Sequence, residues 1–84
     1  MLTAYIQAAM RHATYEILEE NEGFYGEIPG LQGVWGSNDT LEGCREALQA
    51  SLEDWIVFRL RRGLDVPTLD GIDLNMPLIA QEAA

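Results

Sequence analysis

The chain has 84 residues, enough for one small domain, and 48% of them are hydrophobic. It carries 14 acidic residues against five arginines and no lysine, so its net charge is −9. Such a surface repels phosphate backbones, which disfavours direct binding of nucleic acid and indicates either simple solubility or a basic protein partner.

The N-terminal segment has the apolar spacing of a short helix. Apolar residues recur every three or four positions from Leu2 to Met10, without Gly or Pro, which predicts a helix over Leu2–Arg11 that ends by residue 12. The segment is too short and too polar to span a membrane, and it lacks the charged start and continuous apolar run of a secretory signal. We therefore expect a cytoplasmic protein that makes no membrane contact.

Residues 14–36 carry the pattern of three short strands. Thr14–Glu19 alternates, so Tyr15 and Ile17 are expected to share the core face. A turn at 21–23 leads into a returning strand over 24–28, in which Tyr25 and Glu27 lie on the face opposite to Phe24. Pro29-Gly30 ends that strand, and a third strand begins at 34–36.

A long amphipathic helix follows, from about Thr40 to Arg62. Asp39 or Thr40 supplies the N-terminal cap, and Gly63 is placed to end the helix. Three arginines in the last turns suit the helix dipole better than a phosphate site. Cys44 is expected to be a buried structural thiol, which favours a reducing compartment. The predicted apolar stripe comprises Leu41, Cys44, Leu48, Leu52, Trp55, Ile56 and Leu60.

The end of this helix carries more apolar residues than one buried stripe needs. Trp55, Val57 and Phe58 make it apolar around more than half its circumference. Either the C-terminal tail or a second subunit covers the surplus, and the sequence favours the subunit. Trp55, Val57 and Phe58 are therefore the predicted interface of a homodimer or higher oligomer.

Beyond the helix, Pro67 favours an extended segment and Asp70-Gly71 a turn. Ile72 and Leu74 flank Asp73, which predicts a short fourth strand, and residues 76–84 are expected to be frayed. The predicted fold is thus a single α+β domain over residues 1–84 with a core at about 13–75. It comprises an N-terminal helix, a three-stranded antiparallel sheet packed on one long helix, and the fourth strand.

Four segments, in this order, resemble the HicB-like antitoxin domain: EILEENEG, FYGEIPGLQGVW, DTLEGCREAL and RRGLDVP. Gly43 stands where the family often has a second acidic residue. The resemblance implies a β-β-β-α-β fold like part of a ribonuclease-H core. It also implies that the protein binds a small basic HicA-type toxin ribonuclease and blocks the toxin's RNA-binding and catalytic face.

The segment after the predicted fold is too short for the helix-turn-helix or ribbon-helix-helix module that many HicB antitoxins carry. Autoregulation at an operator is therefore not expected to carry over. Solitary members of such a family need not have a cognate toxin, so the alternative function is an oligomeric interaction or regulatory module.

The residues expected to contact a partner lie on the first hairpin and the third strand, where acidic and aromatic side chains occur together: Glu19, Glu20, Tyr25, Glu27 and Trp35. Trp35 has a second reading, in which it packs under the long helix. The same acidic residues, with Glu16, Glu22 and Asp54, raise the alternative of a two-metal nuclease. A solvated acidic edge that prevents aggregation is the favoured explanation.

The sequence predicts no catalytic, cofactor or metal site. His12 is the only histidine and has no second metal ligand near it in sequence. Ser37 and Thr40 have no neighbouring base, and the glycines at 30, 33 and 36 do not form a phosphate-binding motif. The protein is accordingly predicted not to be an enzyme.

Overall fold

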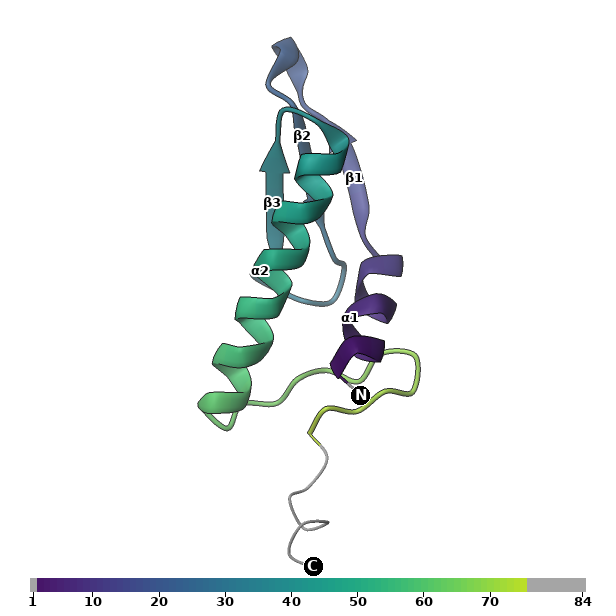
Figure 1. Ribbon diagram of the computed structural model, residues 1–84, viewed down its shortest axis with the longest axis vertical. Coiled ribbons are helices and arrows are strands. Elements are labelled where there is room, and N and C mark those ends of the chain that lie inside the picture. The colour runs from purple at the N-terminus through teal and green to yellow at the C-terminus, as the bar shows by residue number, and fades with distance from the viewer. Residues whose placement is uncertain (1, 76–84) are drawn as a thin grey trace, which may run out of the picture.

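The computed structural model describes residues 2–75, and its architecture confirms the α+β class. The long helix lies across one face of a small sheet, and the short N-terminal helix packs beside its C-terminal half (Figure 1). The elements in chain order are α1 (Leu2–Arg11), β1 (Thr14–Ile17), the 3-10 turn η1 (Glu19–Asn21), β2 (Phe24–Glu27), β3 (Trp35–Asn38) and α2 (Leu41–Arg61).

The sheet is antiparallel in the order β1-β2-β3, and two glycines allow close packing on its helix-facing side. Tyr15, Gly26 and Gly36 form one row across the three strands. A Cβ at Gly26 would lie 2.8 Å from the Tyr15 ring, and one at Gly36 would lie 2.5 Å from the backbone nitrogen of Leu48 in α2. No larger side chain fits at Gly36, so this glycine lets the helix backbone approach β3 directly.

The connection between β2 and β3 contributes three buried side chains to the core. Two consecutive turns are closed by hydrogen bonds from Leu31 N to Ile28 O (3.0 Å) and from Val34 N to Leu31 O (3.3 Å). Gly30 and Gly33 have φ values of +93° and +96°, the positive φ that the third position of a type II turn requires. The repeated turn directs Ile28, Leu31 and Val34 against the helix residues Leu48, Leu52 and Ile56.

Both ends of α2 are closed by local hydrogen bonds. The Thr40 hydroxyl oxygen accepts from Gly43 N at 2.9 Å, so Thr40 is the cap and Asp39 is not. At the other end Gly63 has φ +69°, and the backbone nitrogen of Leu64 donates to Arg59 O at 2.8 Å. The helix that was predicted over Thr40 to Arg62 is confirmed to within one residue at each end.

The predicted fourth strand is wrong. Within residues 2–75 the sheet has three strands, and Ile72 pairs only with Leu69, across the Asp70-Gly71 turn. The turn itself is confirmed, since Asp70 and Gly71 have φ values of +48° and +79°. Ile72 and Leu74 pack against the core from this loop, so their apolar character reflects burial without strand pairing.

The segment after α2 makes one polar contact with α1 and is also closed on itself by side-chain hydrogen bonds. The Tyr5 hydroxyl donates to Pro67 O at 2.5 Å. The Asn75 side chain accepts from Val66 N at 2.9 Å and donates to Val66 O at 2.6 Å, as a neighbouring strand would. The frayed tail that was predicted over residues 76–84 lies outside the described residues.

Candidate protein-binding surface

The sheet has a second face that α2 does not cover, which we term the outer face. Strand alternation places Gly26 and Gly36 under the helix and turns their neighbours in β2 and β3 to the other side. In the observed register the outer face consists of two rows, Thr14–Glu27–Trp35 and Glu16–Tyr25–Ser37.

An aromatic pair occupies this face. The rings of Tyr25 and Trp35 are stacked with centroids 6.2 Å apart and an interplanar angle of 21°. Trp35 remains 54% exposed, and the Tyr25 hydroxyl donates to a Glu27 carboxylate oxygen at 3.1 Å. The alternative in which Trp35 packs under the long helix is therefore wrong, because the helix covers the face that its neighbour Gly36 occupies.

Carboxylates surround the aromatic pair and affect its ionisation. Partial burial, the hydrogen bond to Glu27 and the charges of Glu27 and Glu16 together raise the pKa of the Tyr25 hydroxyl above its ordinary value. The hydroxyl, which is protonated at neutral pH in any tyrosine, therefore keeps its proton to a higher pH here. Residues 14–46 hold eight carboxylates and one arginine, whereas the rest of the described chain holds five carboxylates and four arginines. The charge of the protein is thus concentrated at the end that bears the outer face.

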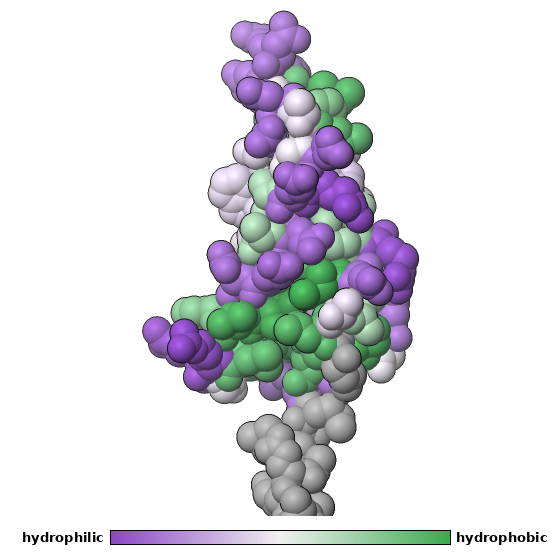
Figure 2. Space-filling view, viewed as in Figure 1, coloured by the Kyte–Doolittle hydropathy of each residue, from purple (hydrophilic) through white to green (hydrophobic). Residues whose placement is uncertain are grey.

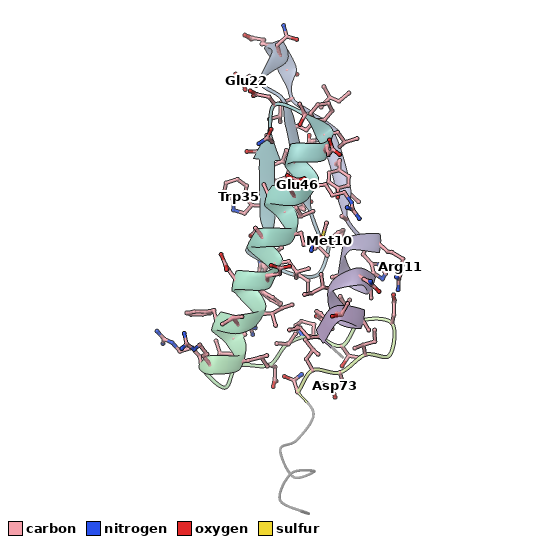
Figure 3. The ribbon with its side chains drawn as sticks, viewed as in Figure 1. Met10, Arg11, Glu22, Trp35, Glu46 and Asp73 are labelled. Carbon is pink, nitrogen blue, oxygen red and sulfur yellow. The ribbon has the colours of Figure 1, made fainter. Side chains whose placement is uncertain are left out.

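The structure brings together three of the five predicted partner residues. Tyr25, Glu27 and Trp35 are neighbours on the outer face, whereas Glu19 and Glu20 lie in η1 at the hairpin tip. Figure 3 labels Trp35 beside β3, and Glu22 near that tip. Glu16 completes the outer face but was not among the predicted partner residues. Its alternation with Tyr15 and Ile17 was the available signal, since it placed Glu16 on the face away from the core.

The acidic residues do not form a metal site within residues 2–75, where no group of three potential ligands was found. Glu16 is opposite Tyr25 and Glu27 is opposite Thr14, so the two carboxylates are diagonal neighbours and do not face each other. His12 contacts Asp70 at 2.9 Å, which joins the end of α1 to the loop after α2.

The predicted oligomer residues divide into two groups. Trp55 is half-buried against the core, and its indole nitrogen donates to Gln32 O at 3.2 Å. Val57 and Phe58 are 49% and 51% exposed. Trp55 is thus engaged within its own chain, whereas Val57 and Phe58 remain accessible.

Cys44 is fully buried on α2, with its sulfur 3.5 Å from Gly36 O. Burial raises the pKa of its thiol, which keeps the group protonated and unreactive. The prediction of a buried structural thiol is confirmed. Neither of the helices described here has the length and apolarity that a membrane crossing requires.

Comparison with known proteins gives a match to a sequence family and a match to a solved structure. The sequence profile of the UPF0150-like family matches residues 4–67. The fold is similar to the crystal structure of TTHA0281 from Thermus thermophilus, with a TM-score of 0.84 and 45% sequence identity over 90% of this chain and 94% of that chain. No curated protein matches the chain.

Proposed function

Because the chain belongs to the UPF0150-like family, within the HicB-like antitoxin superfamily, we propose that it is an antitoxin-like protein that binds a small basic HicA-type toxin ribonuclease. The outer face of the sheet is the surface that holds the toxin. Bound there, the antitoxin covers the toxin's RNA-binding and catalytic face.

The observation that carries this proposal is the exposed Tyr25–Trp35 stack with carboxylates beside it. Exposed tryptophan and tyrosine side chains supply much of the binding free energy at protein interfaces. An arginine of the partner can stack on Trp35 while it pairs with Glu27. Neighbouring Glu16 extends the negative surface, so the whole face complements a basic protein.

Inhibition then requires only steric and electrostatic exclusion. A ribonuclease that binds RNA through a basic surface loses that surface when the acidic outer face covers it. The net charge of −9 on the antitoxin also repels incoming RNA phosphates. Inhibition is therefore stoichiometric, and the antitoxin needs no catalytic group of its own.

The test is co-expression of the tagged chain with the small basic protein encoded beside its gene, followed by capture and mass measurement. RNA cleavage by that protein is then titrated with the purified chain. We expect a stable complex, and cleavage that falls to zero at a fixed molar ratio. The control variant Ile17→Ala shortens a side chain that is 77% exposed on the helix-facing side of β1, and it should inhibit as the native chain does.

Two results would contradict the proposal: no complex with any neighbouring basic protein, or a complex that leaves RNA cleavage and cell growth unchanged. In either case the protein would be an oligomeric interaction or regulatory module of the same fold without a cognate toxin.

A further inference from the structure

A groove of about 570 Å³ lies between α1 and α2. Its walls are stripes of side chains three or four residues apart on each helix: Ile6, Gln7, Met10 and Arg11 on α1, and Arg45, Gln49 and Glu53 on α2. Figure 2 shows apolar side chains flanked by polar ones over this part of the molecule. The size of the groove is within the range of small-molecule sites in proteins.

The floor of the groove is apolar. Met10 belongs to the hydrophobic core and is only 7% exposed, and Ile6 is half-buried against the same core. In Figure 3 the Met10 side chain lies between the two helices. The side-chain amides of Gln7 and Gln49 add polar groups from the two walls. The groove therefore offers an apolar surface to the body of a ligand and hydrogen-bonding groups to its sides.

One end of the groove carries positive charge. Because the two helices run in opposite directions (Figure 1), Arg11 in the last turn of α1 and Arg45 near the start of α2 lie at the same end. Arg11 makes an ion pair with Asp70 at 3.7 Å, but the two side chains are 66% and 41% exposed, so the pair neutralises Arg11 only weakly. Within residues 2–75, Arg45 makes no salt bridge with a carboxylate.

The phenol of Tyr15 lies near Arg45 and leaves the charge of the arginine unbalanced. Burial raises the pKa of the Tyr15 hydroxyl, and the positive charge of Arg45 acts in the opposite direction. The hydroxyl oxygen is buried and makes no hydrogen bond of normal geometry within the described part of the chain. A neutral phenol supplies no counter-charge, so the Arg45 guanidinium is available to pair with an anion.

The other end of the groove carries negative charge. Glu53 accepts a hydrogen bond from the Gln49 side chain at 3.1 Å. It lies eight residues after Arg45, which corresponds to about 12 Å along the helix. A ligand with a second acidic group at that end would be repelled. A length of about 12 Å is also shorter than an average helix, so the groove suits a small molecule better than a helical partner.

We propose that this groove binds a small monocarboxylate with an apolar body, of the medium-chain acyl type. Its carboxylate pairs with Arg45 and Arg11, and its chain covers Ile6 and Met10 and ends before Glu53. The ligand contacts both helices and therefore stabilises the packing of α1 on α2. The site is separate from the outer face of the sheet, and the proposal does not depend on the identity or existence of a toxin.

Calorimetric titration of the full chain with octanoate tests the proposal. We expect saturable binding of one molecule per chain with a dissociation constant below about 1 mM. Acetate has the carboxylate without the apolar body, and octanamide has the body without the charge. Each should bind at least about tenfold more weakly than octanoate, because the site needs both parts of the ligand.

A pair of matched variants tests the assignment of the carboxylate to Arg45. Arg45→Gln should raise the dissociation constant for octanoate at least about tenfold. Arg61→Gln makes the same change in net charge at the other end of α2 and should leave it unchanged. Both side chains are exposed, so neither substitution should unfold the chain.

Nuclear magnetic resonance of the methyl groups locates the ligand without a substitution. The Ile6 and Met10 methyl signals should shift as octanoate is added, whereas those of Ile17, on β1, should not. The proposal would be overturned by the absence of saturable binding, by equal binding of octanoate, acetate and octanamide, or by equal effects of the two arginine variants. Shifts confined to residues outside the groove would overturn it as well.

Discussion

The two faces of the same three strands have opposite compositions. On the inner face Gly26 and Gly36 remove side chains where Tyr15 and the backbone of Leu48 approach. On the outer face the alternating positions carry a stacked aromatic pair and two carboxylates. The inner positions therefore determine folding, and the outer positions are free to recognise a partner. Substitutions on the inner face should lower the free energy of unfolding, and substitutions on the outer face should lower the affinity for a partner.

The largest effect on stability is expected for Gly36→Val. A side chain here would overlap the backbone of α2, so the helix must move off the sheet. We expect the free energy of unfolding in urea to fall by about 3 kcal/mol. The matched control, Ser37→Val on the outer face, should change it by less than about 0.5 kcal/mol. Equal losses for both variants would mean that the two faces do not differ as described.

Trp35→Ala should have the opposite effect: it should leave the stability of the fold nearly unchanged and weaken binding of the partner. Because Trp35 is half exposed and stacks on Tyr25, its loss should change the free energy of unfolding by no more than about 1 kcal/mol. Affinity for the basic partner, measured by calorimetry, should fall by about 2 kcal/mol. If Trp35→Ala unfolds readily but binds the partner normally, Trp35 stabilises the fold and does not contribute to binding.

Tyr5→Phe tests the polar contact that holds the segment after α2. Loss of the hydrogen bond to Pro67 O should cost about 1 kcal/mol in urea unfolding. Burial raises the pKa of the Tyr5 hydroxyl above 10.0, so the native state loses stability as the pH rises through and beyond that value. Tyr5→Phe should reduce this alkaline loss, and an identical pH profile would contradict the burial of the hydroxyl.

Thr40→Ala should give a loss no larger than that of Tyr5→Phe. It removes the side-chain acceptor for Gly43 N and should lower the free energy of unfolding by roughly 1 kcal/mol. Asp39→Ala is the control, because Asp39 precedes the cap, and its effect should be smaller. A larger loss for Asp39→Ala than for Thr40→Ala would mean that Asp39 is the N-terminal cap.

Most of the fold was predictable because its signals are periodic. The spacing from Leu2 to Met10 gave α1, and the stripe through Leu48 and Leu52 gave α2. The fourth strand was predicted wrongly, because alternation over Ile72 to Leu74 is too short to distinguish a strand from a turn. Side-chain contacts such as that of Asn75 with the backbone of Val66 leave no periodic pattern in the sequence.

The candidate site was predictable only in part. Tyr25, Glu27 and Trp35 were identified by residue type, but their assembly depends on strand register, which the sequence did not define. For the same reason the sequence allowed Trp35 to lie either at a partner surface or under the long helix, and Glu16 was not recognised as a neighbour of Tyr25. The family resemblance rested on an ordered set of segments, and all of them lie within residues 4–67, which match the UPF0150-like family. The partner stays a prediction, because its residues belong to another chain.

The most direct test of the central claim is the affinity of two double charge reversals for the captured basic partner. Glu16→Lys with Glu27→Lys alters the outer face, and Glu19→Lys with Glu20→Lys makes the same change in net charge at the hairpin tip. If the outer face binds the partner, calorimetry should show binding abolished by the first pair and reduced only slightly by the second. Equal losses, or a larger loss at the tip, would contradict the assignment of the outer face as the binding surface.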